Sequence, residues 1–190
     1  MAIVLASQSP RRQELLARIG VEDFKTLSLD IDESYPEGLS PEDTVRYIAK
    51  KKCDAAAALC SPDDLIITAD TMVFLGNDRL GKPRDEEDAL RMLRELSGRA
   101  HTVCTGVSVR RGAQEERFAV STRVFFRPMT DDEIRAYIKT GEPMDKAGAY
   151  GVQSRGALFV ERIDGDFFNV MGLPVEQLGL VLARFGVKLL

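Results

Sequence analysis

Histidine is nearly absent from this sequence, since His101 is the single one among 190 residues. A metal site built from several histidines is therefore excluded, and a Ser-His-Asp triad would have to use this residue. We expect His101 to be a partly exposed turn residue at the start of a strand. Chemistry at a functional site then has to depend on other side chains.

Cysteine is also scarce, and the spacing of Cys53, Cys60 and Cys104 contains no C-x-x-C pair. This pattern indicates reduced, mostly buried thiols of a cytosolic protein. The opening residues MAIVLASQSPRR lack the basic and long apolar parts of a signal peptide. No apolar run approaches the ~20 residues of a membrane-spanning helix. We expect a cytoplasmic protein that neither carries a standard export signal nor spans a membrane.

An excess of basic residues is missing as well, because 26 Lys and Arg face 30 Asp and Glu, a formal net charge of −4. This balance argues against a nucleic-acid duplex as partner. It leaves a small polyanionic ligand open, because a local cluster of cations can lie within an acidic protein. With 44% apolar and 29% charged residues, the chain has the composition of a soluble globular protein. We expect residues 1–190 to form one continuous domain.

Apolar runs and helix-start signals alternate along the chain, and this alternation predicts an α/β fold with a mixed sheet. The expected strands cover residues 2–6, 24–31, 65–75, 102–110 and 116–127. The expected helices begin at Ser9-Pro10, at Ser40-Pro41, near Asp85, at the capping box of Thr130 and Glu133, and near Pro174. Asp164-Gly165, between LFVERI and DFFNVM, is expected to be a hairpin turn.

The first candidate site is SQSPRR, residues 7–12, which leaves a predicted strand and enters a helix. A helix start presents unpaired N–H groups and the positive end of the helix dipole, and hydroxyls and guanidiniums add further donors for phosphate. The alternative is an N-cap followed by two solvated arginines. Adjacent helical residues point ~100° apart, so only one arginine need face a given phosphate oxygen.

The second candidate is Asp70-Thr71, which interrupts the apolar run LIITADTMVFL. A carboxylate in a central strand costs free energy unless it is paired or bound to a metal. Strand-end aspartates beside a crevice are typical catalytic residues of α/β sheets. The alternative is structural, with Asp70 capping a neighbouring helix or pairing with a buried arginine.

Weaker signals come from four other segments. GNDRLGKP, residues 76–83, nearly fits a P-loop, but Pro83 replaces the hydroxyl residue, which leaves a hairpin turn and Lys82 as a possible anion-binding residue. Asp30, Asp32 and Glu33 are oxygen ligands suited to magnesium or manganese, or simply a solvated loop. The lysines 50–52 cannot all share one helix face, and GAYGVQ, residues 148–153, is either a base-binding loop or a tight turn.

In their order and spacing, these segments resemble the Maf family of nucleoside triphosphate pyrophosphatases. The similar motifs are S-x-S-P-R-R, DIDES, the lysine helix, ADT, GKP, LSGRAHTVCTG, DKAGAYGVQ and the GLP before the last helix. The resemblance implies an elongated mixed sheet flanked by helices, in two lobes with a central cleft, commonly as a homodimer. It also implies hydrolysis of a nucleoside triphosphate to the monophosphate and pyrophosphate, with magnesium or manganese.

The resemblance implies roles for individual residues. The positions that bind the triphosphate fall on hydroxyl, guanidinium and ammonium side chains: Ser7, Arg11, Arg12, Lys52 and Lys82. Asp70 matches the proton acceptor and Glu33 the acidic residue of DIDES, and these two carboxylates are the expected metal ligands.

Substrate choice is implied at three positions. Arg11, Thr71 and Gln153 match the branch that acts on dTTP and UTP, whereas the 7-methyl-GTP branch would have Trp, Gln and Glu there. Val152 and Ser154 depart from the usual Ile and Gly of the loop that carries Gln153. Two other functions stay open: a house-cleaning pyrophosphatase for modified purine nucleotides, and a nucleotide-binding regulator of septation.

Overall fold

The computed structural model of the protein describes residues 2–190 and contains alternating strands and helices. The strands are β1 (Ile3–Leu5), β2 (Phe24–Thr26), β3 (Leu65–Leu75), β4 (Asp78–Leu80), β5 (Ala100–Arg111), β6 (Gln114–Phe126) and β7 (Val160–Asp164). The α-helices are α1 (Pro10–Arg18), α2 (Pro41–Ala57), α3 (Glu86–Leu96), α4 (Asp131–Ile138), α5 (Phe167–Met171) and α6 (Val175–Arg184). Three short 3₁₀ helices are η1 (Glu142–Asp145), η2 (Ala147–Ala149) and η3 (Arg155–Phe159).

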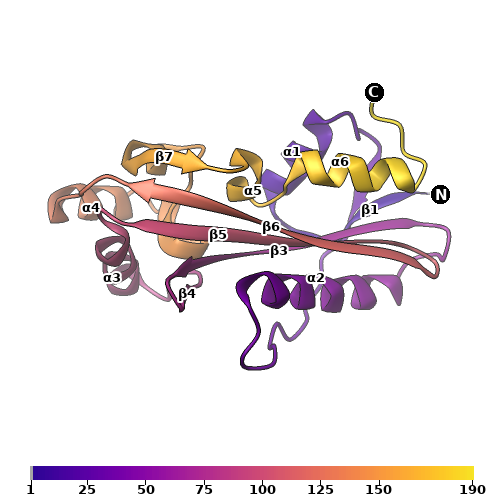
Figure 1. The fold of residues 1–190 in the computed structure, drawn as a ribbon, viewed down its shortest axis with the longest axis horizontal. Coiled ribbons are helices and arrows are strands. Elements are labelled where there is room, and N and C mark those ends of the chain that lie inside the picture. Colours follow the sequence, from indigo (N-terminus) through magenta and orange to yellow (C-terminus); the bar gives the residue numbers. More distant parts are fainter. Residues whose placement is uncertain (1) are drawn as a thin grey trace. The chain divides into compact units, whose positions relative to one another are not determined.

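Within residues 2–190 the strands form one seven-stranded sheet in the order β2-β1-β3-β5-β6-β7, with β4 paired to β3 (Figure 1). Strand β1 runs parallel to β2 and β3, whereas the β3–β4 and β6–β7 pairs are antiparallel. The prediction of an α/β fold with a mixed sheet flanked by helices is confirmed.

The chain divides into two compact units that share the strands β3, β5 and β6. The described part of unit 1 consists of residues 2–70, 105–120 and 172–190. Unit 2 consists of Thr71–Cys104 and Ser121–Met171.

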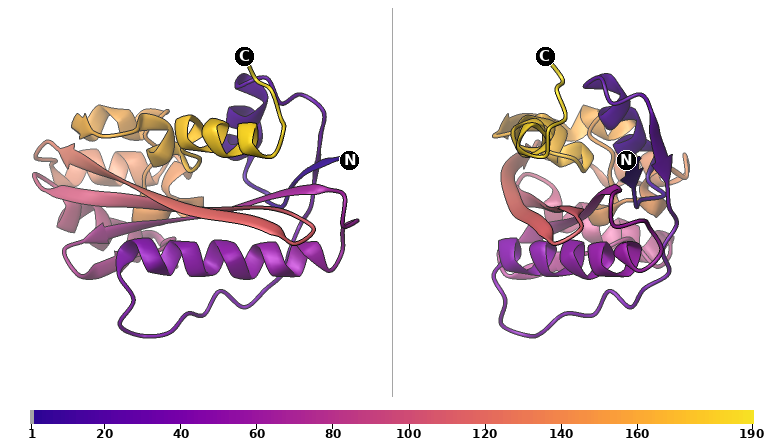
Figure 2. Two further views of the ribbon diagram at one scale, coloured as in Figure 1. Left: turned by 45° about the vertical axis from the view of Figure 1, so that its right-hand side comes forward. Right: turned by 90° about the vertical axis from the view of Figure 1, so that its right-hand side faces the viewer.

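In unit 1, helix α2 covers one face of the sheet while α1 and α6 lie on the other (Figures 1 and 2). The contact with α2 is very close, because a Cβ atom added at Gly106 of β5 would lie 2.3 Å from the carbonyl carbon of Val45. Thr68 of β3 donates a hydrogen bond of 2.7 Å to the carbonyl oxygen of Ala49. These contacts fix α2 on the sheet beside the central strand β3.

In unit 2, an aromatic cluster encloses the histidine, so the prediction of a partly exposed His101 is wrong. His101 is 2% exposed, its Nε2 lies 2.8 Å from the hydroxyl oxygen of Tyr150, and its ring meets that of Phe126 edge-on at 4.9 Å. Strand β5 begins at Ala100, and its alternation directs residue 101 inward together with Val103. Burial lowers the pKa of His101 from 6.5 to about 4.

The buried histidine makes the fold sensitive to acid. Between the native pKa of about 4 and the ordinary value of 6.5, the unfolded chain binds a proton that the native protein does not. This contribution to stability is therefore present above pH 6.5 and is lost as the pH falls toward 4. We expect the free energy of unfolding to drop by about 2 kcal/mol between roughly pH 7 and pH 5 through His101 alone.

Urea unfolding of the wild type and of His101→Gln at the two pH values measures this loss. The glutamine keeps a polar partner for Tyr150 and does not titrate. The stability of the variant should therefore fall by less than that of the wild type between the two pH values. An equal loss in both proteins would contradict the assignment.

Two local predictions are corrected. No second strand follows Asp164-Gly165, because Thr122 on β6 accepts a hydrogen bond from the Asp166 amide and the chain enters α5. Strand β2 ends at Thr26 instead of residue 31, because its parallel partner β1 has only three residues. The prediction that Ser9 is the N-cap of α1 is confirmed, although its side chain makes no capping hydrogen bond.

Other predictions are confirmed. The capping box of Thr130 and Glu133 starts α4. Cys53 and Cys104 are buried free thiols, and Cys60 is a partly buried one.

Among residues 2–190, no helix combines the length and the apolar character that crossing a membrane requires.

Candidate active site

The first part of the candidate site, in unit 1, joins the end of β1 to the first turn of α1. Ser7 follows β1, and its hydroxyl oxygen accepts hydrogen bonds from Arg12 Nη1 at 3.3 Å and from the Ser9 amide at 3.2 Å. Arg12 Nε donates a bond of 2.8 Å to the carbonyl oxygen of Gly172. The guanidinium of Arg12 is thus held between the two chain segments, so it is not one of two solvated arginines.

The electrostatic surroundings of Arg12 connect it to both predicted carboxylates. Burial lowers its pKa, the charges of Asp70 and Glu33 raise it, and the neighbouring Arg11 lowers it. An arginine remains protonated in proteins. Arg12 therefore interacts electrostatically with Arg11, Glu33 and Asp70, and a partly buried positive charge at a helix start attracts an anion.

The second part of the site is a lysine between two carboxylates. Lys52 Nζ on α2 donates a hydrogen bond of 2.7 Å to Asp70 Oδ1 and lies 2.8 Å from Glu33 Oε1. The side chains of Lys52 and Asp70 are only 15% and 8% exposed, whereas that of Glu33 is 56% exposed. Asp70 thus pairs with a lysine rather than with the buried arginine or the helix cap that the sequence left open.

The other two lysines of the run face elsewhere. Lys50 forms an ion pair with Asp54 on the same helix, and Lys51 Nζ lies 3.2 Å from Asp32 Oδ2. The expectation that the three lysines do not share one face is therefore correct.

One oxygen of Asp70 is free to act. Among the described residues 2–190, Asp70 Oδ2 is a buried atom without a hydrogen-bond partner. A buried acceptor without a partner costs free energy, so a ligand, a water molecule or a cation that engages it is favoured.

The donor set fits a hard divalent cation. Within residues 2–190 no cluster of three or more His, Cys, Asp and Glu side chains is arranged to hold a metal. Magnesium, however, is usually bound by one or two carboxylates together with substrate phosphates rather than by a complete protein cage. The buried Oδ2 of Asp70 and the nearby carboxylate of Glu33 match that requirement.

The remaining predicted residues lie in unit 2. Thr71 follows Asp70 on β3 and is partly buried, whereas Lys82 and Gln153 are exposed. Lys82 comes directly after Gly81, whose carbonyl oxygen accepts a bond of 3.1 Å from the Gly148 amide. The GKP segment therefore contacts the Gly-rich segment that leads to Gln153. Strand β4 also pairs with β3 through a tight turn, as expected in place of a P-loop.

Sequence reasoning missed two residues that hold site segments. The Gly172 carbonyl oxygen binds Arg12 from a position 160 residues away in the chain. Glu142 accepts hydrogen bonds from the loop that follows Gln153, including one of 2.6 Å from the Ser154 hydroxyl. In the sequence, only the position of Glu142 in GEPMDKAG, directly before the Gly-rich segment, could have indicated this contact.

Comparison with known proteins shows the family. The family described as Maf-like protein matches residues 2–185. This chain belongs to it. The match covers both residues 7–12, between β1 and the first turn of α1, and the Lys52–Asp70 pair.

Two relatives of this chain carry the same functional name. A protein of Bacillus velezensis named dTTP/UTP pyrophosphatase is 47% identical over 186 residues, which cover 98% of this chain and 97% of the relative. A protein of the same name from Bacteroides thetaiotaomicron is 45% identical over 177 residues, 93% of this chain and 92% of the relative.

A solved structure of lower sequence similarity supports the fold. The structure of a HAM1 protein from Coxiella burnetii has a TM-score of 0.57 and 15% sequence identity, and the match covers 97% of this chain and 99% of that chain. At this identity the similarity concerns the fold alone.

Proposed function

We propose that this Maf-like protein hydrolyses dTTP and UTP to the nucleoside monophosphate and pyrophosphate. The observation that carries the proposal is the buried Asp70 carboxylate, with one oxygen fixed by Lys52 and the other without a partner among residues 2–190. The similarity of the whole chain to relatives named dTTP/UTP pyrophosphatase supports the choice of substrates.

The triphosphate is bound by cationic and hydroxyl side chains. In unit 1, Arg12 is held in place by Ser7 and Gly172, and the start of α1 adds the positive end of its dipole. Lys52 supplies an ammonium group that is oriented by two carboxylates. Positive groups of this kind neutralise the charge that develops on a leaving pyrophosphate. The phosphate-binding roles of Arg11 and, in unit 2, of Lys82 rest on the family resemblance.

Asp70 acts as the general base. Lys52 holds Oδ1, so the carboxylate has a fixed orientation and Oδ2 accepts the proton of the attacking water. The water then attacks the α-phosphorus, the bond from that phosphorus to the bridging oxygen breaks, and pyrophosphate leaves. A single positioned base of this kind accounts for about 10² to 10⁴ of the rate acceleration.

Glu33 and Asp70 would hold the divalent metal, because Asp70 Oδ2 has a second lone pair besides the one that takes up the proton of water. Bound magnesium or manganese polarises phosphate oxygens and makes water more acidic. Lys52 Nζ lies 2.8 Å from Glu33 Oε1 and 2.7 Å from Asp70 Oδ1 and offsets one of their two negative charges, so the site keeps a negative charge that favours a cation.

The specificity residues and the assembly complete the proposal. Thr71 and Gln153, with Arg11, select the pyrimidine base, because a site built to hydrogen-bond one base edge leaves polar groups unpaired with another. Residues 1–190 are one Maf-like domain whose homodimer acts in the cytoplasm. The three free thiols support a reducing compartment.

A substrate panel tests the proposal. We expect kcat/KM for dTTP and UTP to exceed the values for ITP and 7-methyl-GTP by about 100-fold. Activity should disappear with EDTA and return with magnesium or manganese. Pyrophosphate and nucleoside monophosphate are measured in each reaction.

The same panel contains the outcomes that would refute the proposal. A preference for ITP would favour a house-cleaning enzyme for modified purines. Tight binding of nucleotide without turnover of any member would favour a regulator.

A further inference from the structure

In unit 2, one carboxylate gathers the loop that follows Gln153. Glu142 Oε1 accepts hydrogen bonds from the Ser154 hydroxyl at 2.6 Å and from the Gly156 amide at 3.2 Å. Glu142 Oε2 accepts a bond of 3.3 Å from the Arg155 amide. A half-buried carboxylate with three donors from consecutive residues fixes the backbone of residues 154–156.

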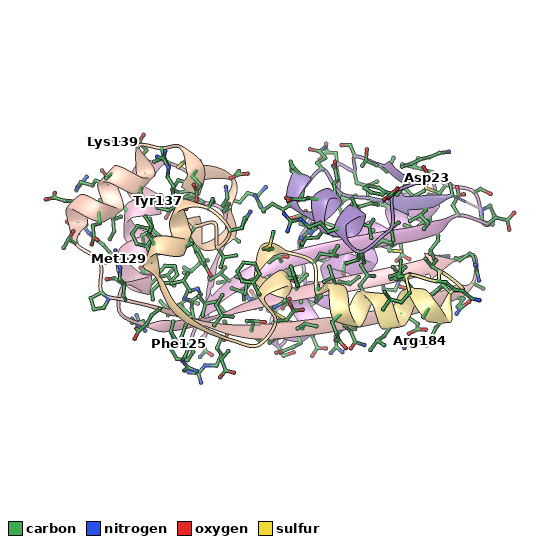
Figure 3. The ribbon with its side chains drawn as sticks, turned by 90° about the horizontal axis from the view of Figure 1, so that it is seen from above. Asp23, Phe125, Met129, Tyr137, Lys139 and Arg184 are labelled. Atoms are coloured by element: carbon green, nitrogen blue, oxygen red, sulfur yellow. The ribbon has the colours of Figure 1, made fainter. Side chains whose placement is uncertain are left out.

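A tyrosine extends this contact to the other side of the loop. Tyr137 on α4, labelled in Figure 3, donates a hydrogen bond of 2.7 Å to Glu142 Oε1 and accepts one of 3.1 Å from the Gly151 amide. Burial and the bond to Glu142 raise the pKa of Tyr137, so its hydroxyl stays protonated and donates. Glu142 and Tyr137 thus fix both Gly151 and residues 154–156, and we call these two side chains the loop clamp.

Two glycines let the loop close on itself. A Cβ atom at Gly156 would lie 2.6 Å from the Gly151 carbonyl oxygen and 2.8 Å from the Tyr137 hydroxyl. A Cβ atom at Gly151 would lie 2.8 Å from both the Ser154 hydroxyl and Lys146 Cε. Residues 151 and 156 are therefore in direct contact, and the sequence between them is a closed loop.

Gln153 is at the corner of this closed loop. The Ser154 amide donates a bond of 3.4 Å to the Gly151 carbonyl oxygen, so residues 151–154 form a turn. Val152 points inward and is 5% exposed, whereas Gln153 is exposed. The loop clamp holds the backbone on both sides of Gln153 and leaves its amide available to a ligand.

We propose that Glu142 is a positioning residue for nucleobase selection, acting through the backbone that carries Gln153. The inference rests on the proposed function, in which Gln153 hydrogen-bonds the pyrimidine. A fixed amide selects one base edge, because the wrong edge leaves it unpaired, whereas a mobile amide adapts to several bases. Ser154, where Gly is common in the family, contributes one of the bonds to Glu142.

Kinetics of a double-mutant cycle test the proposal. Glu142→Ala should raise KM for dTTP about tenfold and leave kcat within about twofold, because the loop positions the base and not the reacting phosphate. Gln153→Ala should have a similar effect. The double variant should be no worse than either single variant, because residues that act as a unit are not additive. Glu142→Gln, which keeps one acceptor oxygen, should recover part of the loss.

Glu133→Ala is the matched control. It removes another carboxylate of unit 2, whose oxygens accept hydrogen bonds from the Thr130 amide and from Arg127. Its KM for dTTP should stay within about twofold of the wild type, although its stability falls. Ser154→Ala removes a single donor and serves as a mild variant that folds.

Hydrogen exchange provides a readout that does not depend on the substrate. The amides of Gly151, Arg155 and Gly156 should exchange faster in Glu142→Ala and not in Glu133→Ala. Faster exchange without a change in KM, or additive effects of Glu142→Ala and Gln153→Ala, would overturn the proposal. If the wild type instead prefers a purine nucleotide, the proposed function fails, and the same cycle on that nucleotide still decides whether Glu142 acts through Gln153.

Discussion

Asp70→Asn is expected to lower kcat for dTTP by about 10³-fold while the protein still folds. The amide keeps the size of the carboxylate but no longer takes up the proton of the attacking water. Lys52 retains Glu33, 2.8 Å away, as an ionic partner, so no buried charge is left alone. Turnover of dTTP, nucleotide binding by calorimetry and urea unfolding together separate loss of chemistry from loss of structure.

Asp64→Asn is the control for this prediction. Asp64 precedes the same strand β3 and accepts hydrogen bonds of 2.9 Å from the Ala2 amide and 3.2 Å from the Ser61 amide. Neutralising Asp64 weakens the loop that precedes β3, so stability should fall while kcat is kept. A rate of Asp70→Asn within about tenfold of the wild type would exclude Asp70 as the base.

The sequence indicated the candidate anion site at residues 7–12 because its signals are local. Pro10 and Gly20 mark the start and end of α1. The two hydroxyl residues lie just before Pro10 and the two arginines directly after it. The run of three lysines shows the limit of such signals. Helical periodicity predicts that the three side chains point in different directions, but it does not predict which of them contacts Asp70. The position of α2 on the sheet determines that this residue is Lys52.

Long-range contacts account for what the sequence did not indicate. His101 is buried by Phe126 and Tyr150, which are distant in the chain, and no local pattern contains that information. The prediction of a hairpin at Asp164-Gly165 was wrong for the same reason. Asn169 Nδ2 donates to the Val103 carbonyl oxygen at 3.0 Å and to Thr122 Oγ1, so tertiary hydrogen bonds favour helix α5 over a second strand.

Gly106→Ala is expected to destabilise the protein by about 3 kcal/mol or more. The added methyl group would lie 2.3 Å from the carbonyl carbon of Val45, 2.4 Å from its oxygen and 2.6 Å from the amide nitrogen of Arg46. These are backbone atoms of α2, so no side-chain rotation relieves the overlap and the whole helix has to move. Since α2 carries Lys52 to Asp70, the surviving folded protein should also lose activity.

Gly179→Ala, in the same unit, tests whether the effect comes from this contact or from the substitution itself. A Cβ atom there meets only Leu189 Cδ1 at 3.8 Å, an ordinary contact distance, and the residue lies inside helix α6. Alanine favours a helix over glycine by about 0.5–1 kcal/mol, so this variant should be more stable than the wild type. Urea unfolding of both variants should give changes of opposite sign. Similar stabilities of the two variants would mean that the close packing of α2 on β5 does not require glycine at residue 106. The proposed link between this packing and the Lys52–Asp70 pair would then be refuted.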